Sequence, residues 1–244
     1  MPKLSISDML KRSASYLPSH WQNSLRHLWF RRLIRQGRFS PSEPDFHILD
    51  ILISPGAWVV DIGANIGQYT ATMSELVGQR GRVLAFEPIP ASFRILSRLS
   101  SCYRYDNVTL LQIAVSDRIG SLAMTVPTLD TGLKNYYEAH LDPEAGDIRV
   151  LALPLDIFAF GPRISLVKID AEGHEPLILE GMMELLKRDW PVLIVETCTS
   201  DMRRALTELG YSIHRLPGSP NRLLCPSSFD SSRLEAHVNR LSRT

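Results

Sequence analysis

Three side chains that can do acid–base chemistry cluster in the second half of the sequence. Asp170, Glu172 and His174 stand at alternate positions directly after the apolar run Leu166 to Ile169, and Glu196 follows the next apolar run. Carboxylates and an imidazole can remove a proton from a substrate, and the ordinary pKa of histidine lies near neutral pH. The pattern predicts catalytic roles for Asp170, Glu172 and His174, and a substrate-binding role for Glu196.

Each of these side chains also has a structural interpretation. His174 could cap the helix that follows it, and Glu172 could neutralise Lys168. Asp170 could orient a cofactor, and Glu196 could make a contact that stabilises the fold. Asp170, Glu172 and Glu196 could gather a magnesium ion, but carboxylate spacing alone is weak support for a metal site, and we predict none.

A glycine-rich turn in the first half of the sequence has the features of a cofactor site. It reads Asp61-Ile62-Gly63-Ala64-Asn65-Ile66-Gly67 and follows an apolar run. A dinucleotide-binding turn needs G-x-G-x-x-G, whereas Asn65 and Gln68 stand where its second and third glycines should be. The carboxylate of Asp61 favours a cofactor with a cationic ammonium group over a pyrophosphate. We therefore predict that Asp61, Gly63, Asn65 and Gly67 bind S-adenosylmethionine.

Two later positions extend this predicted cofactor site. Glu87 ends the next apolar run, 24 residues beyond Gly63. An acid at that place hydrogen-bonds ribose hydroxyls in doubly wound α/β proteins, in dehydrogenases as well as in other enzymes. Ala114 lies in the third run, where the adenine should sit, although ordinary strand packing would explain it equally well.

The elements that must hold these residues alternate between strands and helices, which indicates an α/β fold with a doubly wound, mostly parallel sheet. Strands are predicted at residues 58–62, 82–86, 108–115, 166–169 and 192–195, and helices at 66–77, 90–100, 175–188 and 201–209. Short alternating segments between Gly120 and Leu155 indicate an inserted hairpin. Residues 211–216 and 222–225 flank the turn-rich segment 217–220, which predicts a closing antiparallel hairpin.

The N-terminal segment differs in charge from the rest of the chain. Residues 1–40 hold eight Lys or Arg and one acid, which gives +7, so the total of +1 leaves −6 elsewhere. Residues 20–36 have helical periodicity with two tryptophans, and 39–44 have linker composition. We predict a basic helical extension over 1–44 and one domain over 45–244. The helix either packs on its own domain and covers the active-site mouth, which we favour, or makes peripheral contact with an anionic membrane.

The overall composition is that of an ordinary globular protein of 244 residues, 44% of them hydrophobic. The three cysteines, at positions 102, 198 and 225, form no metal-binding or disulfide pattern. Because the sequence shows neither a signal peptide nor an apolar run of bilayer length, we expect a cytoplasmic location. Peripheral attachment to the membrane is the alternative.

Three segments, in order, resemble the FkbM family of methyltransferases. They are Val60 to Tyr69, Phe86 to Phe93 and Lys168 to Glu175, and the resemblance extends over residues 58–196. The usual KIDVEG run of the family reads KIDAEG here. The resemblance implies a Rossmann-like class I methyltransferase that moves a methyl group from S-adenosylmethionine to a hydroxyl oxygen of a sugar, glycan or secondary metabolite.

Two other functions remain as alternatives. A nicotinamide-dependent oxidoreductase would share the fold, but the missing glycines argue against it. A non-catalytic S-adenosylmethionine-binding protein would have little use for the acids after residue 168. Nucleic acid is not expected as a partner, because residues 41–244 are acidic overall and no Asn/Asp-Pro-Pro-Tyr motif follows the fourth strand. The sequence leaves open the acceptor, the oligomeric state, whether a divalent metal assists, and which of Asp170 and His174 is the base.

Overall fold

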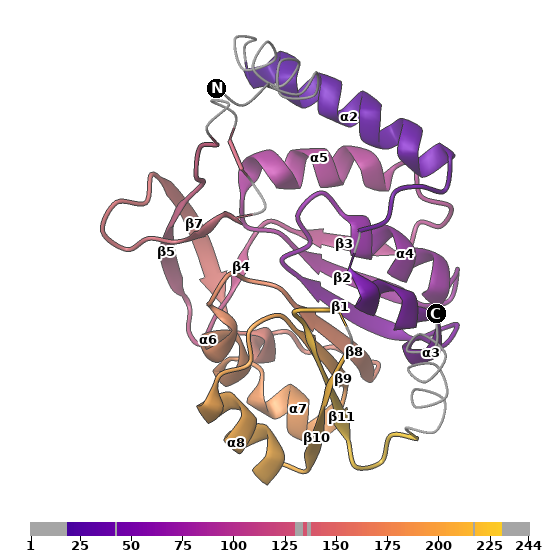
Figure 1. The fold of residues 1–244 in the computed structure, drawn as a ribbon, viewed down its shortest axis with the longest axis vertical. Coiled ribbons are helices and arrows are strands. Elements are labelled where there is room, and N and C mark those ends of the chain that lie inside the picture. The colour runs from indigo at the N-terminus through magenta and orange to yellow at the C-terminus, as the bar shows by residue number, and fades with distance from the viewer. Residues whose placement is uncertain (1–18, 42, 130–133, 136–137, 217, 231–244) are drawn as a thin grey trace.

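The computed structural model describes residues 19–41, 43–129, 134–135, 138–216 and 218–230. Its centre is a seven-stranded sheet with the order β10-β11-β9-β8-β1-β2-β3 (Figure 1). The strands are β1 (Trp58–Ile62), β2 (Arg82–Phe86), β3 (Val108–Leu111), β8 (Ile164–Ile169), β9 (Val192–Val195), β10 (Tyr211–Arg215) and β11 (Arg222–Pro226). β11 runs antiparallel to both of its neighbours, β9 and β10, and the other neighbouring strands of this sheet are parallel to each other. The strand order reverses between β1 and β8, and such a reversal opens a ligand-binding crevice at the carboxyl ends of the strands.

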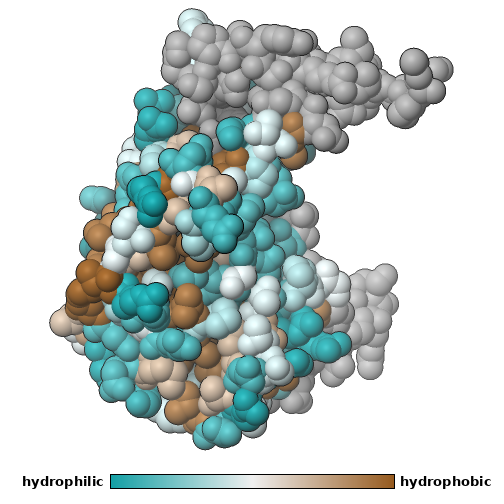
Figure 2. All heavy atoms as spheres, turned by 90° about the vertical axis from the view of Figure 1, so that its left-hand side faces the viewer, coloured by the Kyte–Doolittle hydropathy of each residue, from teal (hydrophilic) through white to brown (hydrophobic). Residues whose placement is uncertain are grey.

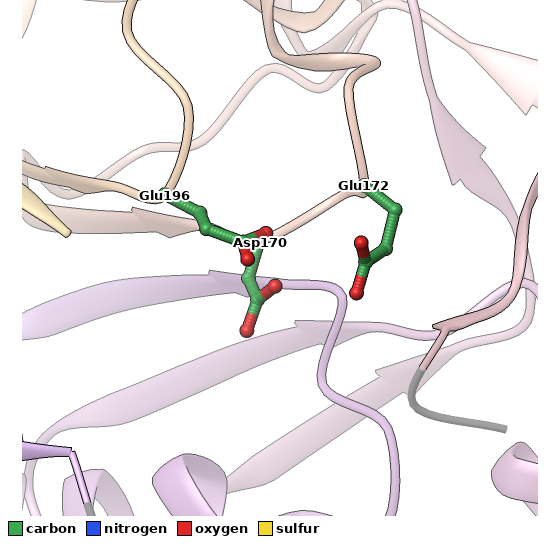
Figure 3. Close-up of side chains that lie close together, drawn as sticks. All are labelled: Asp170, Glu172 and Glu196. Carbon is green, nitrogen blue, oxygen red and sulfur yellow. The ribbon is translucent and has the colours of Figure 1, made fainter. Parts of the chain in front are cut away.

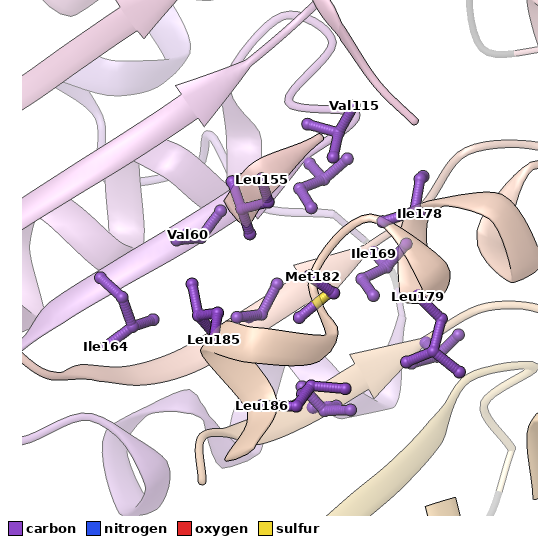
Figure 4. Close-up of a cluster of buried hydrophobic side chains, with 14 of the residues drawn as sticks. Val60, Val115, Leu155, Ile164, Ile169, Ile178, Leu179, Met182, Leu185 and Leu186 are labelled. Carbon is purple, nitrogen blue, oxygen red and sulfur yellow. The ribbon is translucent and has the colours of Figure 1, made fainter. Parts of the chain in front are cut away.

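Helices cover both faces of this sheet. On one face lie α3 (Leu49–Leu52), α4 (Gln68–Val77) and α5 (Pro90–Ser100), and on the other lie α6 (Glu175–Glu180), α7 (Met183–Asp189) and α8 (Ser200–Glu208). Successive strand residues point to opposite faces. Val59 therefore packs with Met73 of α4, whereas Val60 packs with Leu185 of α7 (Figure 4). The doubly wound α/β fold and the closing hairpin β10–β11 confirm the predictions.

A second sheet of four strands, in the order β4-β7-β5-β6, stands beside the first. Its strands are β4 (Ala114–Val115), β5 (Gly120–Thr125), β6 (His140–Leu141) and β7 (Ile148–Leu153). The pair β5 and β7 is the predicted inserted hairpin. The prediction of one strand over 108–115 was wrong, because β2 ends before Pro88 and offers residues 112–113 no partner. Ala114 and Val115 pair with β7 instead.

The single helix predicted over 175–188 was also wrong, since the chain forms α6 and α7 with a break at Gly181 and Met182. A Cβ atom on Gly181 would lie 1.9 Å from the carbonyl oxygen of Ser116, so only glycine allows this approach. The carboxylate of Asp156 then accepts hydrogen bonds from the backbone N–H groups of Glu184 and Leu185, at 2.9 and 2.8 Å, which starts the new helix.

The predicted N-terminal helix is α2 (Ser19–Arg35), and it packs on its own domain against α5. Phe30, Leu33 and Ile34 contact a buried cluster that includes Phe39 and Ile95. The 3₁₀ helix η1 (Pro44–Ile48) then leads into α3. The part of the predicted extension before residue 19 lies outside the described residues, and so do residue 42 of the linker and residue 217 of the turn.

Among the described residues, every helix is too short or too polar to cross a bilayer.

Figure 2 shows the side of the molecule that carries β5 and β7. Hydrophobic residues there form small groups among hydrophilic ones. Another short 3₁₀ helix, η3 (Leu155–Ile157), joins β7 to the segment before β8.

Candidate active site

The glycine-rich turn that follows β1 lies directly against the acidic segment that follows β8. Gly63 has a φ of +77°, and a Cβ atom there would lie 1.8 Å from the carbonyl oxygen of Asp170. Only glycine therefore fits where the cofactor turn meets the acidic segment. Asn65 also has a positive φ, of 50°, which asparagine tolerates better than most residues.

Gly67 has a different role from the other predicted turn residues. Its φ of +92° places it at the start of α4, and a Cβ atom there would lie 2.5 Å from Leu96 of α5 and 2.5 Å from the hydroxyl of Tyr103. Gly67 does not line the cavity that Gly63 and Asn65 line. The structure therefore gives it a packing role between α4 and α5, and its predicted contact with the cofactor stays a prediction.

Asp61 supplies a buried acceptor to the site. One carboxylate oxygen, Oδ2, accepts a hydrogen bond of 2.6 Å from the hydroxyl of Thr70. The other, Oδ1, is buried and has no hydrogen-bond partner among the described residues. Burial raises the pKa of Asp61, and the charge of Lys168 opposes this. A buried acceptor without a donor fits a cofactor that brings an ammonium group.

Both carboxylate oxygens of Glu87 are held by the backbone. They accept 2.8 Å hydrogen bonds from the N–H groups of Asn65 and Ile89. Burial raises the pKa of Glu87 to about 7, although these two hydrogen bonds oppose the shift. Glu87 thus joins the end of β2 to the glycine-rich turn, and it lines the same cavity as Asp61.

One cavity of about 250 Å³ unites the predicted cofactor and catalytic residues. It is lined by Asp61, Gly63, Asn65, Glu87, Ala114, Asp170, Glu172, His174 and Glu196. Leu122, Met124 and Leu141 of the second sheet also line it, as do Pro41 and Glu43 of the segment that follows α2. No described residue of α2 lines the cavity, so this segment, and not the helix, reaches the site.

Asp170 is paired with a lysine inside the sheet. Its Oδ2 lies 2.7 Å from Nζ of Lys168, and the side chain of Lys168 is only 3% exposed. The ammonium group also lies 4.4 Å from the centre of the Tyr69 ring. Burial would raise the pKa of Asp170, but the charge and hydrogen bond of Lys168 bring it below the usual value. Asp170 is therefore an ionised, weakly basic carboxylate, and Asp170 rather than Glu172 neutralises Lys168.

His174 is buried and lines the cavity at the start of α6. Its Nε2 lies 3.0 Å from the hydroxyl oxygen of Ser116, which follows β4. His174 occupies the N-cap position of α6, but its side chain makes no capping hydrogen bond. The imidazole therefore does not cap the helix. Burial lowers the pKa of His174, and the charge of Asp117 opposes this. The imidazole is therefore neutral at neutral pH and able to accept a proton.

Asp170, Glu172 and Glu196 form a cluster in which one carboxylate oxygen of each lies within 4.8 Å of the others (Figure 3). Three carboxylates in this arrangement could hold a divalent cation. Burial and the neighbouring charge of Asp170 raise the pKa of Glu196 to about 8, however, and Lys168 already neutralises Asp170. At neutral pH Lys168 therefore compensates the charge of Asp170 and the carboxyl group of Glu196 is protonated, so two of the three side chains are poor ligands for a cation.

Sequence reasoning missed Lys168 and Ser116 as members of the site. A lysine inside an apolar run was the available signal for the first, because a buried ammonium group needs a charged partner. Ser116 carried no comparable signal, because its partner His174 is 58 residues away and meets it only through the packing of α6 beside β4.

These features define a class of protein. The strand order, the turn without a pyrophosphate pattern and the acids on both sides of one cavity are those of a Rossmann-like transferase that binds a nucleoside cofactor with an ammonium group.

The chain belongs to the FkbM methyltransferase family, because the model of the methyltransferase FkbM domain matches residues 61–213. This confirms the predicted family and its methyl donor, S-adenosylmethionine.

Two curated relatives are similar to this chain. "Methyltransferase 1" of Beauveria bassiana is 29% identical over 167 residues, 59% of this chain and 66% of that protein. "Methyltransferase sdnD" of Sordaria araneosa is 31% identical over 170 residues, 57% of this chain and 65% of that protein. The chain thus covers slightly less than two thirds of either relative. The crystal structure of methyltransferase FkbM from Methylobacillus flagellatus KT aligns with a TM-score of 0.49 at 17% identity, over 71% of this chain and 44% of that one.

Proposed function

We propose that this protein transfers a methyl group from S-adenosylmethionine to a hydroxyl oxygen of a small molecule or glycan, such as a sugar or a secondary metabolite. The observation that carries the proposal is the single cavity in which a neutral, buried histidine faces the same space as the cofactor turn. When bound, the donor supplies an electrophilic methyl group on a positively charged sulfur. The protein must then align the acceptor and take up one proton.

The two candidate bases differ in basicity. The charge of Lys168 keeps Asp170 ionised and lowers its pKa, which makes it a poor acceptor for the proton of an alcohol. His174 is neutral and has no ion-pair partner within 4.0 Å among the described residues. We therefore assign His174 as the base. The carboxyl proton of Glu196 bonds to Asp170. Asp170 and Oε2 of Glu196, which has no hydrogen-bond partner among the described residues, are then suited to accept hydrogen bonds from hydroxyls of the acceptor.

A methyl-donor assay tests the activity. The protein is incubated with labelled S-adenosylmethionine and a panel of sugars, lipid-linked glycans and polyketides, with matched amines in place of hydroxyls as controls. Labelled ethers are the expected products, and transfer to the amines alone would refute O-methylation. Calorimetric titration with S-adenosylhomocysteine and with NAD separates a methyltransferase from an oxidoreductase. Binding of the former without any turnover would favour a non-catalytic protein.

The assignment of the base has its own test. Replacing His174 by Ala should lower kcat by about 10² to 10⁴, the usual contribution of a positioned base, with little change in affinity for S-adenosylhomocysteine. His47→Ala, at an exposed histidine outside the cavity, is the matched control. If Asp170→Asn shows the large loss of kcat while His174→Ala is mild, Asp170 is the base instead.

The outward face of α2 supports a second proposal, which concerns a partner. Leu25, Leu28 and Trp29 are 50%, 59% and 59% exposed, on the side opposite the residues that pack on α5. Arg32 and Arg35 are exposed in the last turn of the same helix. Apolar and basic side chains combined on one surface helix suit an anionic lipid surface. We propose that this face docks on such a membrane.

Vesicle sedimentation tests the docking. Vesicles that contain phosphatidylglycerol should sediment the protein, and pure phosphatidylcholine vesicles should not. Leu28→Asp should abolish sedimentation, whereas Ile119→Asp, at another exposed apolar residue, should not. Equal sedimentation of wild type and Leu28→Asp would refute the docking. Dimerisation in solution that Leu28→Asp abolishes would assign the face to a second copy of the chain.

A further inference from the structure

Ser116 is fixed more firmly than a solvent-facing serine would be. Its side chain is buried, and its backbone N–H donates a 3.0 Å hydrogen bond to the carbonyl oxygen of Leu153. Its own carbonyl lies so close to Gly181 that no Cβ atom would fit between them. The second sheet and the break between α6 and α7 thus hold this residue from two directions.

The hydroxyl of Ser116 connects an imidazole to a carboxylate. Its Oγ donates to Oδ1 of Asp117 over 3.0 Å and lies 3.0 Å from Nε2 of His174. A carboxylate only accepts hydrogen bonds, so the single hydroxyl hydrogen points to Asp117. The oxygen then has only lone pairs to offer the imidazole. Nε2 must therefore carry the hydrogen of the neutral ring.

We propose that Ser116 and Asp117 are positioning residues that hold His174 in the Nε2–H tautomer, so that Nδ1 is the atom that takes up the proton of the acceptor. Nδ1 makes no hydrogen bond to any residue in the described part of the chain, and the His174 side chain lines the cavity. This inference rests on the assignment of His174 as the base.

The step balances in atoms and charge. The acceptor oxygen bonds to the methyl carbon as the methyl–sulfur bond breaks, and the sulfur keeps that electron pair. The hydroxyl proton moves to Nδ1, and Nε2–H stays hydrogen-bonded to Ser116. The positive charge that forms on the ring then faces Asp117 through the serine hydroxyl, and the charge of Asp117 favours the protonated ring. Nη1 of Arg118 lies 3.3 Å from Oδ2, the other oxygen of Asp117.

The tautomer can be measured directly by nuclear magnetic resonance. Long-range ¹H–¹⁵N correlation on the full chain, labelled with ¹⁵N-histidine, distinguishes protonated from unprotonated ring nitrogens. His174→Gln identifies the signals of His174 among the seven histidines. Wild type should show the Nε2–H form. Ser116→Ala should give a mixture of tautomers. Asp117→Asn should favour Nδ1–H, because its amide can donate to Ser116 Oγ and free the hydroxyl to donate to Nε2.

Turnover of the acceptor found in the hydroxyl panel gives an independent measurement. Ser116→Ala and Asp117→Asn should each lower kcat by about 10²-fold, the lower end of what a positioned base contributes, with unchanged affinity for S-adenosylhomocysteine. Asp201→Asn, which breaks an exposed carboxylate–arginine pair elsewhere, should change neither the tautomer nor kcat.

Three results would overturn the inference. A wild-type protein in the Nδ1–H form would refute the assigned tautomer, and so would a Ser116→Ala variant with the wild-type spectrum. If the tautomer changes as expected but kcat does not, Nδ1 is not the proton acceptor. In that case the assigned base fails, while methyl transfer to the hydroxyl panel still stands.

Discussion

At the scale of single residues, Glu87 combines two tasks that sequence reasoning could not separate. Its carboxylate holds the backbone of Asn65 and Ile89 and also lines the cofactor cavity. Hydrogen bonds to a charged group contribute about 1.5 to 3 kcal/mol, so Glu87→Ala should weaken binding of S-adenosylhomocysteine by about tenfold or more. It should also lower the Tm, since the backbone N–H groups of Asn65 and Ile89 lose their acceptor.

Calorimetric titration and thermal unfolding check the prediction for Glu87. Glu208→Ala, at an exposed acid at the end of α8, is the control and should leave both quantities unchanged. An affinity equal to that of wild type would remove Glu87 from the cofactor site and leave it as a brace for the turn.

Glu196 makes the stability of the protein depend on pH. Its pKa is raised from 4.5 to about 8, mainly by burial and by the charge of Asp170. The folded state therefore binds more protons than the unfolded state between these two values, so the free energy of unfolding falls as pH rises through this range. Glu196→Gln, which imitates the protonated acid, should reduce the slope. Part of it should remain, because burial also raises the pKa of Glu87 from 4.5 to about 7.

Thermal unfolding of the ligand-free protein across this pH range measures the slope. Glu208→Gln should keep the wild-type slope. A Glu196→Gln variant whose stability falls with pH as steeply as that of wild type would show that Glu196 is not protonated in the folded protein.

The acidic residues that the sequence predicted for the site converge on one cavity because each lies at the carboxyl end of a parallel strand, at the same edge of the sheet. Asp61 is the last residue but one of β1, and Glu87, Asp170 and Glu196 directly follow β2, β8 and β9. Gly67 belongs to the same motif, but a Cβ atom at this position would point toward α5 and not into the cavity. This orientation follows from the packing of the helices and cannot be predicted from the motif. The contact of His174 with Ser116 likewise depends on how α6 packs beside β4, and the spacing of the two residues along the sequence does not predict it.

At the scale of elements, the break between α6 and α7 shows where periodicity misleads. Apolar residues continue at helical spacing through Gly181, so the pattern predicts one helix. Gly181 instead lies against the carbonyl of Ser116, and Asp156 caps the second helix from a distant segment. The strand over 108–115 fails for a related reason, since its second half finds a partner in β7 and not in β2. Tertiary contacts decided both boundaries.

Gly181→Ala tests this close approach. The new Cβ atom would lie 1.9 Å from the oxygen and 2.8 Å from the carbon of the Ser116 carbonyl, so the backbone would have to move. Such overpacking costs about 1 to 3 kcal/mol, which should appear as a lower Tm. At Gly161 no atom lies within 4 Å of an added Cβ, so Gly161→Ala should leave the Tm nearly unchanged. Equal Tm values for the two variants would mean that the chain relaxes at Gly181 without cost.

At the scale of the whole molecule, a basic N-terminal region and an acidic remainder of the chain meet at α5. The basic helix α2 packs on α5 through Phe30, Leu33 and Ile34, and the acidic remainder holds the cavity. Burial and the charges of Arg98 and Arg31 lower the pKa of His27, which shows that positive charge from both helices gathers where they meet. The segment that follows α2 then brings Pro41 and Glu43 to the cavity.

Removal of residues 1–38 should separate the functions of these regions. Because the described residues of the deleted segment do not line the cavity, affinity for S-adenosylhomocysteine should stay close to that of the full chain. The cluster around Phe39, Ile66 and Ile95 loses the apolar face of α2, so the Tm should fall. Turnover of a water-soluble acceptor should persist, since Pro41 and Glu43 remain, whereas sedimentation with anionic vesicles and turnover of a vesicle-bound acceptor should be lost.

In the full chain, Leu33→Ser should lower the Tm without abolishing sedimentation, which distinguishes the packing of α2 on α5 from the docking of its outward face. Loss of S-adenosylhomocysteine binding in the truncated protein would show instead that α2 shapes the glycine-rich turn through Ile66.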